Sequence, residues 1–299
     1  MRINSLVECV PNFSEGRDQS VIRRLAEAAT ASPGAALLHQ TADVSHNRSV
    51  FTLAGEPEGV MEAVFRMAET AVALIDLNAH RGAHPRMGAV DVIPFVPLKD
   101  IDMAACVSLS EKLGRRLWEE LGLPVFLYGE SARSPERRDL AFLRRGQFEG
   151  LAERITREGL LPDFGDNSPH PTAGVTACGA RGFLVAFNMN LDTSDIGVAR
   201  AVAKIIRASS GGLPHVKAIG VLLEDRNIAQ VSVNMTDYKR TPLYRVLEFV
   251  RFEAARYGAR VVGTEIVGMA PAAALLDCAR YYMCIEDFDI DARILEKYM

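Results

Sequence analysis

The chain has 299 residues, of which 48% are hydrophobic and 24% are charged, and its formal net charge is −4. These values are typical of a globular protein with about two domains, and they exclude a disordered, collagen-like or coiled-coil chain. The small negative charge also argues against nucleic acid and membrane surfaces as partners, because both recruit basic proteins.

Five cysteines are spread along the chain, at positions 9, 106, 178, 278 and 284. Their odd number and the lack of CxxC spacing argue against a disulfide framework and a structural zinc site. We therefore expect reduced thiols in a cytoplasmic protein. The N-terminal sequence MRINSLVECVPNF lacks the apolar core of a secretion signal, and no apolar run approaches the roughly 18 residues of a membrane helix.

In the first half of the chain, strand-like and helix-like hydrophobic patterns alternate in a regular order. They predict strands at 6–13, 35–41, 48–54, 88–96 and 124–128. They predict helices at 18–31, 57–76 and 101–121. Residues 133–182 then carry a charged helical pattern and, at 161–174, a Pro- and Gly-rich stretch. We interpret the stretch 161–174 as a linker between two halves.

The second half repeats this order of elements. Its patterns predict strands at 183–191, 216–223, 228–236 and 260–267. Helices are predicted to begin at Ser194 or Asp195, near Pro242 and at Pro271. The sequence therefore predicts an α/β (α+β) fold of two tandem ferredoxin-like βαββαβ subdomains, 1–179 and 180–299, with their open sheet faces packed toward each other.

Two strands of the second half carry neutral polar side chains on one face. Alternation places Asn188 and Asn190 together on one strand, and Gln230 and Asn234 together on another. A face that only meets water usually carries Lys and Glu, whereas amides offer hydrogen-bond donors and acceptors without charge. We therefore predict that this face binds a ligand rather than solvent.

The segment His80–Asp91, HRGAHPRMGAVD, is the densest cluster of reactive residue types. His84 lies just ahead of a predicted strand between two arginines, Arg81 and Arg86, which suit carboxylate binding. Asp91 on that strand could orient the imidazole. His46 and His80 are competing candidates for a catalytic histidine.

A metal site is conceivable but not expected. His46, His80 and His84 could join Asp43 around an ion, yet their spacing matches no known ligand pattern. The chain also lacks GxGxxG, Walker A, HExxH and GxSxG motifs, which argues against nucleotide, zinc-protease and serine-hydrolase functions.

Several segments resemble the formiminotransferase domain family. They are VECVPNFSEG (7–16), HPRMGAVDVIPF (84–95), PDFG (162–165), FNMNL (187–191), AQVSVNMTDY (229–238) and VVGTEIVGMAP (261–271). The resemblance implies transfer of a formimidoyl group between N-formimidoyl-L-glutamate and tetrahydrofolate, which is a co-substrate. Because no ligand pattern typical of a metal is present, we expect the transfer to need no metal. It also implies folate bound between two similar subdomains, a homodimer, and His84 as the catalytic base. The chain ends at Met299, so we expect no cyclodeaminase domain.

The resemblance places a folate-binding segment after the PDFG motif. It comprises Gly165, Asp166, Asn167, Ser168, Pro169, His170, Pro171, Thr172, Ala173 and Gly174. We add as substrate- or folate-binding candidates Asn12, Asp43, Arg86, Asp91, Asn188, Asn190, Gln230 and Asn234. The segment is more polar than its mammalian counterpart, and TADVSHNRS (41–49) also departs from the family pattern.

Three alternatives stay open at this point. The chain could act on 5-formyltetrahydrofolate in a cyclo-ligase-like reaction, use N-formylglutamate as the donor, or bind folate without turnover. The first would require ATP, for which no motif is present. The cluster around His84, Pro85 and Arg86 argues against the last.

Overall fold

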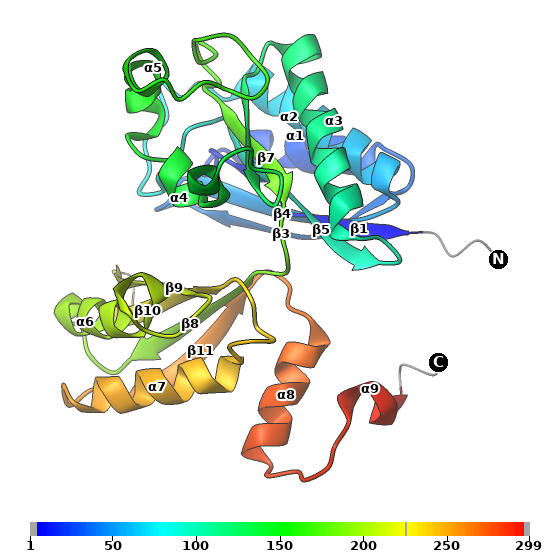
Figure 1. Cartoon of the computed structure of the whole chain (residues 1–299). Helices are drawn as coiled ribbons and strands as arrows, with labels where there is room; N and C mark the ends of the chain where they lie inside the picture. Colours follow the sequence, from blue (N-terminus) through cyan, green and yellow to red (C-terminus); the bar gives the residue numbers. More distant parts are fainter. Residues whose placement is uncertain (1–4, 225, 296–299) are drawn as a thin grey trace. The chain divides into compact units, whose positions relative to one another are not determined.

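The structure is a computed structural model that describes residues 5–224 and 226–295. The chain divides between Arg181 and Gly182 into two compact units (Figure 1). The boundary expected from sequence, between residues 179 and 180, lies two residues earlier. Within the described ranges, no helix is long and apolar enough to cross a membrane.

The first unit contains one mixed sheet and its helices. Its strands are β1 (Leu6–Cys9), β2 (Asn12–Phe13), β3 (Ala35–Asp43), β4 (Arg48–Gly55), β5 (Val90–Lys99), β6 (Val125–Gly129) and β7 (Thr176–Ala180). Its helices are α1 (Gln19–Thr30), α2 (Pro57–Leu74), α3 (Met103–Leu121), α4 (Leu140–Leu143) and α5 (Gln147–Arg157), with a 3-10 turn, η1 (Pro135–Arg138).

Four strand positions of this sheet have the ferredoxin-like order. β1 pairs antiparallel with both β5 and β4, and β3 pairs with β4 on the far side. The predicted strand 6–13 is broken at Val10 and Pro11, and its second piece, β2, pairs with the same two neighbours. The predicted fold class is therefore confirmed for this unit.

The sequence patterns predicted no strand between residues 133 and 182, but the structure has one there. Residues 176–180 form β7, which lies parallel to β5 on one side and to β6 on the other. The strand was missed because its sequence, TACGA, is short, has small side chains and is buried on both faces, so it shows no alternation. The expected charged helix is also divided into η1, α4 and α5, with Gly146 in a left-handed conformation (φ 73°) before α5.

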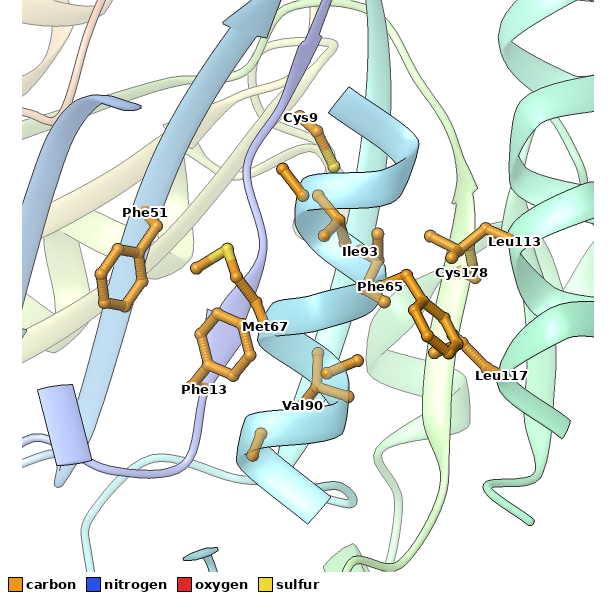
Figure 2. Packing of buried hydrophobic residues seen from close by; sticks show 14 of the residues in the cluster. Cys9, Phe13, Phe51, Phe65, Met67, Val90, Ile93, Leu113, Leu117 and Cys178 are labelled. Carbon is orange, nitrogen blue, oxygen red and sulfur yellow. The ribbon is translucent and has the colours of Figure 1, made fainter. Parts of the chain in front are cut away.

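Helices cover the two faces of this sheet unequally. α1, α2 and α3 enclose the main core, where Phe13 and Phe51 meet edge to face at 5.5 Å, and Figure 2 shows Met67 of α2 beside these rings. A smaller core on the opposite face joins α4 and α5 to β6 and β7, and includes Phe126 and Leu151.

A β-bulge turns Asp91 away from the main core. Asn12 is paired with Val92, but the next residue, Phe13, is paired with Val90, so Asp91 is an extra residue in β5. Val90 belongs to the main core and Val92 to the smaller one. Bulges re-aim side chains in this way and are common beside active sites.

The second unit is a four-stranded antiparallel sheet with helices on one face. Its elements are β8 (Val185–Leu191), α6 (Ile196–Ile206), η2 (Ala208–Ser210), β9 (Val216–Leu223), β10 (Ile228–Met235), α7 (Leu243–Ala255), β11 (Val261–Val267), α8 (Ala272–Tyr282) and α9 (Ile290–Arg293). The strand order β11-β8-β10-β9 is again ferredoxin-like, which confirms the predicted duplication of topology. The packing of the two open faces against each other stays a prediction.

Candidate functional site

His84 lies buried between a carboxylate and a guanidinium. Its Nε2 atom is 3.5 Å from Oδ2 of Asp91, and its Nδ1 atom is 3.4 Å from Nη1 of Arg48. Because a guanidinium can only donate, Nδ1 is the acceptor and the proton of the neutral ring lies on Nε2, toward Asp91. The ring therefore lies between groups from two strands, β4 and β5, and its Nε2, which makes no hydrogen bond among the described residues, faces Asp91 at ion-pair distance.

Asp91 is fully buried and is held by three donors. Its Oδ1 accepts the backbone N–H of Met87 at 2.8 Å, and its Oδ2 accepts Nε of Arg144 at 2.9 Å as well as a second Arg144 N–H. Burial raises the pKa of Asp91, but Arg144 and the contact with His84 lower it by more than burial raises it. The pKa of Asp91 therefore lies well below its ordinary value. Asp91 is thus an ionised, fixed partner for the imidazole.

The surroundings of His84 keep the imidazole neutral. Burial lowers the pKa of His84 to about 4, and the charges of Arg48 and Arg144 act in the same direction, while Asp91 opposes them. A neutral imidazole with an acceptor nitrogen is the form that can take a proton from an incoming amine. His84 is therefore available as a base at neutral pH.

The loop between β3 and β4 is fastened to the segment that carries His84. Asn47 accepts the backbone N–H of Gly16 at 2.9 Å and donates to the carbonyl of Arg81 at 3.1 Å. Its own carbonyl is 2.8 Å from Nε2 of His80. A Cβ on Gly16 would lie 2.3 Å from the carbonyl oxygen of Asp43, so only glycine allows this close approach. These contacts explain why the VPNFSEG motif ends in glycine.

Arg86 is committed to partners inside the unit. It is 4% exposed and forms a two-pronged ion pair with Glu149 at 2.7 and 2.8 Å, and its Nε donates to Nδ1 of His80 at 3.1 Å. Gln147 accepts a further N–H. Its predicted role as a substrate contact stays a prediction, and the geometry favours instead a role in holding α5 against the His80–Asp91 segment.

The other histidine candidates are placed differently from His84. His80 acts as a bridge between Asn47 and Arg86, and burial lowers its pKa. The His46 ring contacts Asp43 at 3.1 Å, Asp43 also accepts the His46 backbone N–H at 2.7 Å, and the His46 carbonyl accepts the backbone N–H of His84 at 3.4 Å. Across the part of the chain that the structure describes, no group of three or more His, Cys, Asp or Glu is placed to hold a metal.

The C-terminal end of the predicted folate segment is hydrogen-bonded to the segment that carries His84. Gly174 forms a bridge with Gly88, and Ala89 donates its N–H to the carbonyl of Ala173 at 2.9 Å. His170 Nδ1 accepts the backbone N–H groups of Ala173 and Thr172, which closes a tight turn. A cluster of exposed residues leads into this turn, namely Asp166, Asn167 and Ser168. The structure therefore brings residues 170–174 beside the HPRMG motif, while folate contacts there stay a prediction.

The polar face of the second unit is a connected network of amides around one carboxylate. Gln230 donates to Oδ1 of Asn190 at 2.8 Å and to Oε1 of Glu265 at 2.9 Å, and Asn188 donates to the same Oε1 at 3.1 Å. The sequence prediction of a face without charge is therefore wrong, because Glu265 reaches it from β11. Asn234 lies further along β10 and is exposed.

One predicted residue, Asn12, lies apart from these polar groups, and three of their members were not predicted. Asn12, on β2, is half-buried and donates to the carbonyl of Val10 at 2.9 Å. Sequence reasoning missed Arg48, Arg144 and Glu265 as members of these polar groups. Arg48 stands in the "NR" pair that follows His46, and Glu265 lies in the matched VVGTEIV motif, so both had a signal; Arg144 had none.

Two family models match the chain. The N-terminal subdomain of the formiminotransferase domain matches residues 6–181, and a second formiminotransferase domain model matches residues 186–294. The two matches correspond closely to the two compact units.

Three relatives carry formimidoyltransferase names, and two of them have a length similar to that of this chain. A glutamate formimidoyltransferase of Streptococcus pyogenes serotype M1 is 54% identical over 294 residues, with 98% of each chain covered. One of Thermoplasma acidophilum is 48% identical over 297 residues, covering 99% of this chain and 97% of the relative. The formimidoyltransferase-cyclodeaminase of Mus musculus is 45% identical over 286 residues, covering 94% of this chain and 53% of the relative.

Proposed function

The chain belongs to the formiminotransferase family, and on this premise we propose that it transfers a formimidoyl group between N-formimidoyl-L-glutamate and tetrahydrofolate with His84 as the base. It is a transferase, and its reaction is formimidoyl transfer involving glutamate. The observation that carries the role of His84 is the position of its buried imidazole between Asp91 and Arg48 inside the HPRMG motif.

The proposed chemistry needs two proton movements. The amine of tetrahydrofolate attacks the formimidoyl carbon and gives its proton to Nδ1 of His84, while Asp91 stabilises the imidazolium that forms. The tetrahedral intermediate then breaks its bond to the glutamate nitrogen, which receives the proton back from His84. The histidine ends in its starting state, so one residue serves as both base and acid.

We assign the folate ring to the amide face of the second unit. A pterin presents neutral donors and acceptors, and Asn188, Asn190 and Gln230 offer matching groups. Glu265 could accept two ring N–H groups at once, since its second oxygen has no partner among the described residues. The turn at 170–174 supports a contact between folate and the HPRMG segment. A metal-free mechanism, a homodimer and a cytoplasmic location stay predictions.

The alternatives from sequence are not favoured. The names of the relatives support formimidoyl rather than formyl transfer, and a folate-binding protein without turnover would not need a buried His84–Asp91 pair. A cyclo-ligase-like reaction would require ATP.

One assay tests the proposed function directly. Purified protein is treated with a chelator and mixed with tetrahydrofolate and N-formimidoyl-L-glutamate without ATP, and glutamate release is followed. N-formyl-L-glutamate serves as the matched control donor. We expect release from the formimidoyl donor and much slower release from the formyl donor. Release only from the formyl donor, or only with ATP or a divalent ion, would overturn the proposal.

A further inference from the structure

Arg48 differs from Arg86 and Arg144, the other arginines with little exposure around His84, because no carboxylate is paired with it. Among residues 5–224 and 226–295, no carboxylate oxygen lies within 4.0 Å of its guanidinium, and its one polar side-chain contact is with Nδ1 of His84. Arg144 and Arg86, in contrast, are paired with Asp91 and Glu149. The site therefore holds one half-buried cation that is left for an external anion.

The surroundings of Arg48 make it unfavourable to leave its positive charge unpaired. Burial lowers the pKa of its guanidinium and the charge of Arg144 acts in the same direction, while the carboxylates of Asp91 and Asp43, beyond 4.0 Å, oppose them. Charged groups inside proteins are normally paired or hydrogen-bonded, because desolvation of an unpaired charge is unfavourable. A planar guanidinium in such a place is suited to bind a carboxylate through two parallel hydrogen bonds.

The position of Arg48 is fixed before any ligand arrives. It is the first residue of β4 and lies opposite Asp43 at the end of the β3–β4 hairpin. Its backbone packs against Gly16, where a Cβ would lie 2.5 Å from the nitrogen of Arg48. Preorganised groups bind with less loss of conformational entropy. The backbone of Arg48 is thus fixed, and its guanidinium lies 3.4 Å from Nδ1 of the imidazole.

We propose that Arg48 binds the α-carboxylate of N-formimidoyl-L-glutamate and thereby positions the donor at His84, an inference that rests on the proposed function. In this donor the α-carboxylate is attached to the carbon that also bears the formimidoyl nitrogen. A carboxylate on Arg48 therefore places the nitrogen that must leave three bonds from the oxygens that make the contact. That nitrogen is then close to Nδ1 of His84, which must return a proton to it.

The same contact explains how His84 becomes free to act. Without a ligand, an N–H of Arg48 occupies Nδ1, the acceptor that the reaction needs. When the donor's carboxylate engages the guanidinium, that N–H turns to the carboxylate and Nδ1 is released. The carboxylate also offsets the positive charge beside the imidazole, so the donor makes His84 a stronger base as it binds.

The test compares Arg48→Gln and Arg48→Lys with Arg66→Gln, which removes an exposed arginine on α2. We expect Arg48→Gln to raise the KM for N-formimidoyl-L-glutamate about 10–100-fold, as for loss of a charged hydrogen-bond pair. Its tetrahydrofolate affinity should be unchanged, which also shows that the variant is folded. Arg48→Lys should recover part of the loss, and Arg66→Gln should behave as the natural protein.

Two further readouts separate positioning from a structural role. The acid limb of kcat/KM should shift to higher pH in Arg48→Gln, because a positive charge beside His84 is removed. The donor with its α-carboxylate converted to an amide should be poor for the natural protein but no poorer than the parent donor for Arg48→Gln. Discrimination that persists in Arg48→Gln, or that falls on the γ-carboxylate instead, would overturn the assignment.

Failure of this inference can be told apart from failure of the proposed function. Binding of L-glutamate, the product, can be measured by titration calorimetry with no turnover. Weaker glutamate binding by Arg48→Gln supports the carboxylate site even if formimidoyl transfer were absent. Equal binding by the variant and the natural protein would overturn it even if transfer were observed.

Discussion

The two units share one sheet topology but present different chemistry on the face opposite their main helices. In the first unit this face holds two arginines, a histidine and a carboxylate in direct contact, namely Arg48, Arg144, His84 and Asp91. In the second unit it holds amides arranged around a single carboxylate, Glu265. Under the proposed function, proton transfer belongs to the first unit and recognition of a neutral ring to the second.

Local departures from the shared topology account for this difference. The first unit has a bulge at Asp91 and an added pair of parallel strands, and the chain between those strands supplies Arg144. The second unit has regular pairing between β8 and β10, so its polar residues simply alternate with apolar ones. The buried Asp91 and its partner Arg144 thus lie where the first unit departs from the shared topology.

The largest effect should come from the imidazole. We expect His84→Ala to reduce kcat about 10²–10⁴-fold, the range for loss of a general acid–base group, with little change in folate affinity. Steady-state kinetics and folate titration check this. His46→Ala is the matched control and should keep its activity. If the two variants behaved alike, the proposed base would be misassigned.

The carboxylate beside His84 should matter for stability as well as rate. Asp91→Asn breaks the ion pair between the fully buried Asp91 and the partly buried Arg144, and breaking a buried pair typically costs about 3–5 kcal/mol. We expect a lower free energy of unfolding in urea and slower transfer. Asp102→Asn is a suitable control, since Asp102 caps α3 at an exposed site where Asn caps as well. Equal stability of both variants would contradict the buried pair.

Substitutions on the amide face should change folate affinity rather than kcat. We expect Asn190→Leu to weaken folate binding by about 1–3 kcal/mol, because Gln230 then loses one of its two acceptors and the hydrogen-bond capacity of Asn190 is removed. Asn234→Leu, at an exposed position on the same face, should have a smaller effect. A change in kcat with normal folate affinity would break the division of roles between the units.

The smallest effect on the reaction should come from Arg86. Its guanidinium is committed to Glu149, whose pKa it lowers to about 2, so we expect Arg86→Gln to leave the KM values unchanged at low and high salt. Thermal unfolding should show only a stability change. A salt-dependent rise in KM, greatest at low ionic strength where charges reach furthest, would return Arg86 to the substrate site.

Sequence patterns predicted the repeated topology because each βαββαβ unit has clear alternation and helix boundaries. They could not predict the charge cluster, since Asp91 and Arg144 are 53 residues apart and meet only through the bulge and α4. His84 was found through its motif. Its partner Arg48 was not, because nothing local in the sequence shows that an arginine lacks a carboxylate.

The central claim is that His84 is a neutral base with its proton on Nε2, and an NMR titration of the six histidine rings tests it most directly. The signal of His84 is identified by its loss in His84→Gln. We predict a ring that stays neutral well below pH 6.5, with a midpoint near 4, and carbon shifts of the Nε2–H form. A midpoint at or above 6.5, or the Nδ1–H form, would contradict the account.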